Sequence, residues 1–169
     1  MMKRLAVAAV AAVVLGVPAD AIAQESADAN LNVSVNVLQG LTLTGGGTLD
    51  FGNQVTGAGE TTIDAAADGI ALEALGDGGR SIAVTFPATV SLNGAGEGLT
   101  FTPAVVASQT ADGTFEVIST GDAVELSGSN FEAGSHSFRV GGTLQAIPQN
   151  QAAGAYTGSF LMTVAYTEL

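Results

Sequence analysis

The chain has 169 residues, no cysteine and no tryptophan, and its formal net charge of −12 comes from 16 acidic residues against four basic ones. This length allows one domain of medium size. Without cysteine the chain cannot form a disulfide, a thiolate nucleophile or an iron–sulfur cluster. A strongly acidic surface repels phosphate groups. We therefore expect no nucleic acid and no anionic membrane surface as partners, and no cofactor.

Residues 1–23 have the features of a cleaved secretory signal. The start is positively charged, an apolar run of 13 residues extends from Leu5 to Val17, and Ala21-Ile22-Ala23 has the small-x-small form of a cleavage site. A helix needs roughly 20 apolar residues to span a bilayer, so this run is too short for an anchor. We expect an exported protein in the periplasm, on the cell surface or outside the cell, with no membrane segment after cleavage.

From Asn30 onward, apolar and polar residues alternate with a period of two, as in strands with one buried and one solvated face. The first run is residues 31–37, in which one face carries Leu31, Val33, Val35 and Val37. Later runs lie at residues 41–43, 82–86, 115–117, 138–140 and 160–166. In the last run, one face carries Phe160, Met162, Val164 and Tyr166. Short strands separated by glycine-rich turns predict an all-β, antiparallel β-sandwich.

Two features could interrupt this pattern. Residues 63–75 are rich in alanine, and we expect at most one or two helical turns there because Gly69 weakens a helix by about 1 kcal/mol. Pro87, Pro103 and Pro148 lie next to strand-like runs. Since proline cannot donate a hydrogen bond to a neighbouring strand, each is expected at a strand end or on an edge strand.

The residues that usually perform chemistry are scarce. His136 is the only histidine, falls on the same face as Phe138, and cannot form the two- or three-histidine site that zinc chemistry generally uses. The Gly-x-Ser-x-Gly pattern of serine hydrolases is absent from the sequence. Four carboxylates lie near glycines, in a spacing that fits no EF-hand calcium loop: Asp64, Asp68, Glu73 and Asp77. We therefore predict no catalytic, metal-binding or cofactor-binding residues, and a structural role for His136.

Three segments together resemble a known family. They are Leu-Asp-Phe-Gly at residues 49–52, Phe-Arg-Val-Gly-Gly-Thr-Leu at 138–144 and Gly-Ala-Tyr-Thr-Gly-Ser-Phe at 154–160. From about Asn30 to Tyr166 the chain resembles the secreted bacterial family called domain of unknown function 4402. Through residues 49–52 and its terminal strand it is also similar, more distantly, to the group of spore coat protein U and the archaic chaperone–usher pilins.

The pilin resemblance implies an immunoglobulin-like sandwich that is completed by the extended N-terminal segment of a neighbouring subunit. The side chains entering the neighbour would be Leu31, Val33, Val35 and Val37, because strand addition combines backbone hydrogen bonds with alternate side chains in pockets. The strand that carries Phe160, Met162, Val164 and Tyr166 would be an edge strand or the binding site of a periplasmic chaperone. Residues 31–37 fit the first strand of the domain's own sheet equally well.

These considerations divide the chain into a signal (1–23), an N-terminal strand or extension (24–38) and a β-sandwich domain (39–169). We predict a non-enzymatic, pilin-like structural subunit of a surface fibre or coat, which associates with copies of itself or with related subunits. The alternative is a self-contained periplasmic or secreted binding module that does not polymerise.

Overall fold

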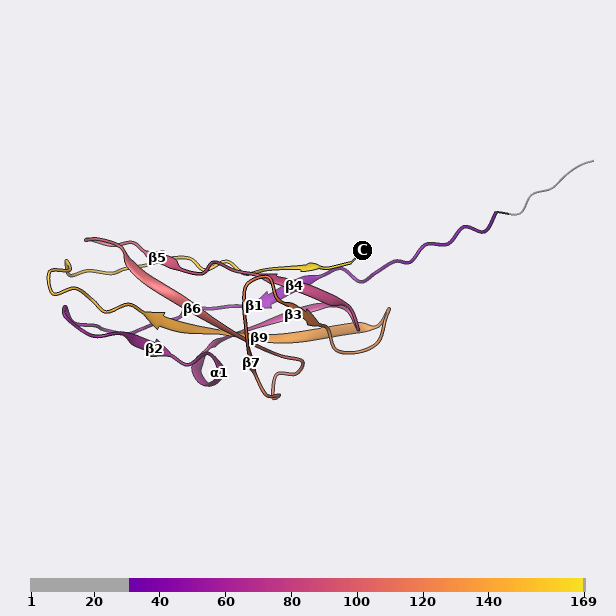
Figure 1. Ribbon diagram of the computed structural model, residues 1–169, viewed down its shortest axis with the longest axis horizontal. Helices are drawn as coiled ribbons and strands as arrows, with labels where there is room; N and C mark the ends of the chain where they lie inside the picture. The colour runs from indigo at the N-terminus through magenta and orange to yellow at the C-terminus, as the bar shows by residue number, and fades with distance from the viewer. Residues whose placement is uncertain (1–30, 169) are drawn as a thin grey trace, which may run out of the picture. The chain divides into compact units, whose positions relative to one another are not determined.

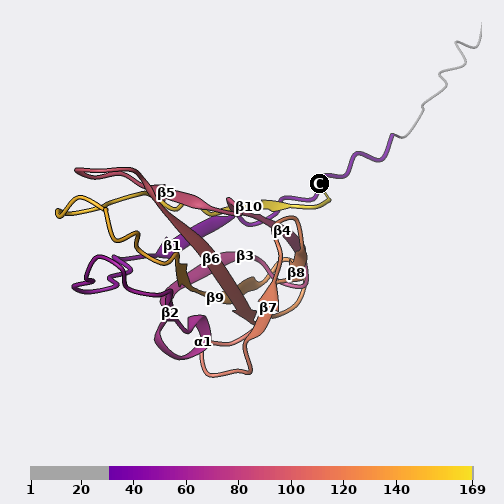
Figure 2. The same cartoon turned by 60° about the vertical axis from the view of Figure 1, so that its left-hand side comes forward.

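The computed structural model describes residues 31–168, so the predicted signal lies outside the described residues. The chain divides after Val35. Residues 31–35 are assigned to no strand, and residues 36–168 form the domain drawn in Figures 1 and 2. Its elements are β1 (Thr42–Gly45), β2 (Thr61–Ile63), α1 (Ala65–Asp68), β3 (Ile70–Asp77), β4 (Ser81–Thr85), β5 (Val90–Leu92), β6 (Leu99–Ser108), β7 (Glu116–Ile118), β8 (Ala123–Glu125), β9 (Ala133–Leu144) and β10 (Thr163–Tyr166).

The larger of two sheets has the strand order β1-β3-β9-β6-β5, with β2 paired to β9 and β7 paired to β6. Its centre is the pair of long strands β6 and β9, which run side by side in Figure 1 and are paired from Phe101 opposite Leu144 to Ser108 opposite Ser137. β3 and β2 follow each other along one edge of β9, and β5 and β7 follow each other along the far edge of β6.

The smaller sheet has three strands in the order β10-β4-β8. Its central strand places Ile82 and Val84 inward, where both are fully buried against the large sheet. The common core consists of Ala74, Ile82, Val84, Val105, Ala107, Leu126, Phe138, Val140 and Met162. Every strand pair is antiparallel, so the predicted all-β sandwich is confirmed.

The alanine-rich stretch forms one helical turn, as predicted, and then a strand. Asp64 caps α1 by accepting hydrogen bonds from the backbone N–H groups of Ala66 at 2.8 Å and Ala67 at 3.0 Å. In both views α1 lies on the opposite side of the large sheet from β4 and β10. The rest of the stretch is β3, which pairs with β9 along its whole length. No helix among residues 31–168 is long and apolar enough to cross a membrane.

The prolines follow the prediction at two positions and contradict it at the third. Pro87 lies just beyond the end of β4, and Pro148 lies beyond the end of β9. Pro103, however, lies in the middle of β6, which is a central strand. The prediction that Pro103 marks a strand end or an edge strand is therefore wrong.

Pro103 is tolerated because of a break in the pairing along the far edge of β6. The carbonyl of Thr100 accepts a hydrogen bond from the backbone N–H of Gln145 on the β9 side. The N–H and C=O groups of successive residues point to opposite sides of a strand. Residue 100 points its backbone groups toward β9, so residue 103 points its backbone groups toward the side of β5 and β7. There β5 pairs with β6 only as far as Phe101, and β7 begins opposite Val105. The missing N–H of Pro103 thus faces the interval between two short strands.

Candidate functional site

The first and last strands leave the two sheets with neighbouring free edges. In the described chain β1 pairs only with β3 and β10 pairs only with β4, while β1 and β10 also contact each other. We call this edge, formed by residues 41–45 and 160–166, the open seam; it is visible in Figure 2. Its partly buried side chains pack against the core: Leu41, Leu43, Phe160, Val164 and Tyr166. Free strand edges present unpaired backbone groups that can bind a further strand.

The predicted terminal strand forms one side of the open seam. Phe160, Val164 and Tyr166 are partly buried and Met162 is 7% exposed, whereas Leu161 between them is 74% exposed. This confirms the predicted inward face. The regular strand is shorter than the predicted run, because β10 begins only at Thr163.

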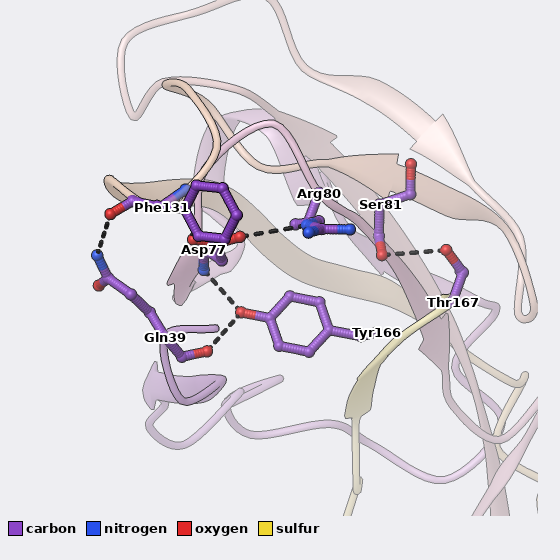
Figure 3. A network of polar contacts seen from close by, with 7 residues as sticks. All are labelled: Gln39, Asp77, Arg80, Ser81, Phe131, Tyr166 and Thr167. Carbon is purple, nitrogen blue, oxygen red and sulfur yellow. Dashed lines mark hydrogen bonds and ion pairs between the residues drawn. The ribbon is translucent and has the colours of Figure 1, made fainter. Parts of the chain in front are cut away.

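A network of polar contacts closes one end of the open seam (Figure 3). The hydroxyl of Tyr166 accepts a hydrogen bond from the backbone N–H of Asp77 at 2.6 Å and donates one to the carbonyl of Gln39 at 2.8 Å. The Asp77 side chain is fully buried, and its carboxylate accepts from the backbone N–H of Phe131 at 2.8 Å and from Arg80 Nε at 3.2 Å. Gln39 Nε2 donates to the Phe131 carbonyl at 3.5 Å. We call these five residues the Gln39 clamp.

The clamp holds one residue in an unusual backbone conformation. Phe131 has a φ of 67°, in the left-handed region that non-glycine residues seldom adopt. Its N–H is bonded to the Asp77 carboxylate, and its carbonyl accepts from Gln39. Such a conformation costs on the order of 1–3 kcal/mol and persists only where surrounding contacts impose it. The buried Asp77 carboxylate supplies that constraint.

A second tyrosine closes the other end of the C-terminal segment. The Tyr156 hydroxyl donates to the carbonyl of Ala152 at 2.8 Å and lies 2.7 Å from Gln151 Nε2. Next to it, the backbones of Thr157 and Asn93 exchange hydrogen bonds of 2.8 and 3.0 Å. The segment between the two tyrosines is therefore fixed at both ends.

The predicted donor residues are unpaired in the described chain. Residues 31–40 are assigned to no strand. The exposed fractions of Leu31, Val33, Val35 and Val37 are 84%, 84%, 81% and 77%. Residues up to Val35 belong to a separate unit, so the interpretation of this run as the first strand of the domain's own sheet stays a prediction. Its pairing with a neighbouring molecule is likewise still a prediction.

His136 faces the core, as its position beside Phe138 predicted. Its Nδ1 lies 2.8 Å from the carbonyl of Glu125, and its ring centroid lies 5.2 Å from that of Phe138. Burial lowers the pKa of His136 below its ordinary value of 6.5, against the opposing effect of the backbone hydrogen bond at Glu125. The imidazole thus links β9 to the end of β8 across the core.

Of the four carboxylates considered as calcium ligands, two have other structural roles, and Asp68 is the last residue of α1. Asp64 caps α1, and Asp77 belongs to the Gln39 clamp. Glu73 lies on the exposed side of β3. Among residues 31–168, no group of three or more acidic or histidine side chains is placed to hold a metal ion.

A hollow of about 270 Å³ lies on the outer face of the large sheet. Its lining includes Thr44, Glu73, Phe115 and Arg139. The Arg139 guanidinium lies over the Phe115 ring, 4.5 Å from its centroid, and donates a hydrogen bond to the Ala66 carbonyl. Such a cation–π contact fixes the arginine in place.

The sequence did not predict the Gln39 clamp. Its members come from four separate parts of the chain, and Gln39 and Tyr166 are 127 residues apart. Leu41 and Leu43 continued the predicted alternation, but nothing in the sequence placed them opposite the terminal strand. The one residue type in the sequence that hints at this close packing is the glycine at position 76. A side chain there would place its Cβ 2.5 Å from the Tyr166 hydroxyl.

The fold and its open seam define an antiparallel β-sandwich whose first and last described strands, β1 and β10, each pair on one side only. The model of the family described as "Domain of unknown function (DUF4402)" matches residues 41–166, and the chain belongs to this family. The predicted family is therefore confirmed. No curated protein matches the sequence.

Proposed function

We propose that the protein is a non-enzymatic, exported structural subunit of a surface fibre or coat, and that its subunits are joined by β-strand addition. The observation that carries this proposal is the open seam, where partly buried core residues border two free strand edges. Residues 31–37 supply the complementary pattern, with one apolar face and one polar face. An added strand would bury that face and pair with the free edges.

The free-energy balance requires both side chains and backbone. Four aliphatic side chains would contribute on the order of 6–12 kcal/mol when buried, at about 1.5–3 each. Ordering seven residues costs about 1–2 kcal/mol for each backbone unit, and association costs more. Strand addition is therefore favourable only if the side chains are buried and the backbone hydrogen bonds also form. A single charged residue on the apolar face should then prevent assembly.

Paired substitutions in residues 31–37 test this proposal on the chain that begins at Gln24. Val33→Asp and Val35→Asp place a charge on the apolar face, and we expect each to leave a folded monomer. Asn32→Asp and Ser34→Asp place the same charge on the polar face and should assemble like the wild type. Sedimentation velocity and electron microscopy measure the outcome. A monomeric wild type, or equal assembly of all four variants, would contradict the proposal.

The same edge is the expected binding site of a periplasmic chaperone before assembly. A chaperone would cover the free edge of β10, where Phe160, Val164 and Tyr166 are only partly buried. An unprotected edge of this kind promotes uncontrolled association.

The alternative is a self-contained binding module, which the hollow beside Phe115 and Arg139 favours. A ligand that binds only the folded state raises the melting temperature. Screening sugars and small carboxylates by thermal denaturation tests this alternative, with Arg139→Gln as the variant that should lose the shift. A ligand-dependent shift in a protein that stays monomeric would favour the module over the subunit.

A further inference from the structure

We infer that the Gln39 clamp is a positioning device that directs residues 31–37 into a second copy of the chain by opposing their return to the seam of their own subunit. This inference rests on the proposed function. Its basis is that Gln39 lies between residues 31–37 and β1, and that hydrogen bonds hold both its backbone carbonyl and its side chain.

Return to the same subunit would require a hairpin. β1 begins three residues after Gln39 and leads away from the clamp, while β10 ends at Tyr166 inside the clamp. For residues 31–37 to enter the seam beside β1, the chain must reverse direction at residues 38–40. The resulting strand would be antiparallel to β1 and parallel to β10.

The clamp opposes that reversal at its central residue. The Gln39 carbonyl accepts from the Tyr166 hydroxyl, and Gln39 Nε2 donates to the Phe131 carbonyl. A tight turn centred on residue 39 would reorient the backbone and break both bonds. Each lost hydrogen bond corresponds to roughly a two- to tenfold change in an equilibrium.

The strained backbone of Phe131 supports a positioning role. The Asp77 carboxylate holds Phe131 at a φ of 67° and so presents its carbonyl to Gln39. Strain of this kind is retained where a defined geometry is needed. Addition of a strand from a second copy leaves Gln39 in place, so the clamp favours donation between molecules over closure within one.

Disulfide trapping measures the choice directly, because the natural chain contains no cysteine. In the closed form, residues 31–37 occupy the open seam of their own subunit. In this form the double variant Asn36→Cys with Ala165→Cys places both thiols near the clamp, on the outward face. The double variant Asn32→Cys with Ala165→Cys places them far apart in that closed form. Closure yields an intramolecular disulfide in the first variant only, and donation yields intermolecular disulfides. Alkylation, mass spectrometry and non-reducing electrophoresis separate the products.

Clamp variants of the Asn36/Ala165 protein then test the inference. Gln39→Ala and Tyr166→Phe should each raise the ratio of intramolecular to intermolecular disulfide by about two- to tenfold. Tyr156→Phe removes a hydroxyl with comparable hydrogen bonds at the other end of the segment and should leave the ratio unchanged. Gln39 is exposed, so its replacement should not impair folding.

The outcomes separate the two proposals. An unchanged ratio in both clamp variants, or an equal rise in Tyr156→Phe, overturns the positioning role. If intermolecular disulfides still form in those cases, strand addition stands without the clamp. If neither kind of disulfide forms with residue 32 or 36, residues 31–37 do not occupy the seam, and both proposals are refuted.

Discussion

Replacement of Gly142 by alanine should destabilise the sandwich strongly. Gly142 lies where β9 changes its partner from β3 to β2, and it faces Pro103 of β6. Its φ is 141°, which disfavours any L-residue with a Cβ. An added Cβ would overlap the carbonyl oxygen of Thr102 and lie 2.7 Å from Phe101 Cε2. The backbone conformation costs on the order of 1–3 kcal/mol and overpacking a similar amount, so we expect a loss of about 2–6 kcal/mol.

Urea denaturation followed by circular dichroism measures this loss as a change in the free energy of unfolding. Gly59→Ala is the matched control, because no atom lies within 4 Å of its added Cβ and its φ is outside the left-handed region. The control should stay within about 1 kcal/mol of the wild type. A free energy of unfolding for Gly142→Ala within about 0.5 kcal/mol of the wild-type value would contradict this prediction. It would show that the backbone near residue 142 shifts at little cost to accommodate the added Cβ.

Two further predictions concern buried polar side chains. Because burial lowers the pKa of His136 below 6.5, the unfolded chain takes up a proton first as the pH falls. The contribution of His136 to stability is therefore complete above about pH 6.5 and declines below it. The free energy of unfolding should fall between pH 7.5 and pH 5.5, and it should fall less in His136→Gln than in the wild type. Asp77→Ala leaves the Phe131 N–H and the Arg80 guanidinium without their acceptor and should cost about 2–4 kcal/mol in thermal or urea unfolding. Asp77→Asn keeps one acceptor oxygen and should cost about half as much; equal losses would show that the hydrogen bond to Phe131 carries little of the effect.

Alternation in the sequence was sufficient to predict the sandwich but not the course of its central strands. The runs at residues 82–86 and 138–140 became β4 and part of β9 because one face of each meets the core. No alternating run was identified over β6, because Pro103 interrupts it. In addition, Val105, Val106 and Ala107 are all buried, so apolar and polar residues do not alternate there. Burial on both faces arises from tertiary packing, which a local pattern does not record.

The candidate site was predicted in part for the same reason. The alternation of apolar and polar residues was enough to place Val164 and Tyr166 on an inward face. Their position beside Leu41 and Leu43 depends on the order of strands in two sheets, and the first and last strands are more than a hundred residues apart. The contacts of Asp77 depend on a turn geometry at Phe131 that its residue type disfavours. Such long-range and strained features carry no local sequence signal.

The position of β10 also affects the order of events during biogenesis. β10 is one of only three strands in the small sheet of the described chain, and it follows the other two, β4 and β8, in the sequence. Until residues 163–166 have been synthesised, β4 lacks a partner on one side, and Ile82 and Val84 lack part of the cover that β10 provides. Completion of the small sheet must therefore wait for residues 163–166, even if β4 has already paired with β8.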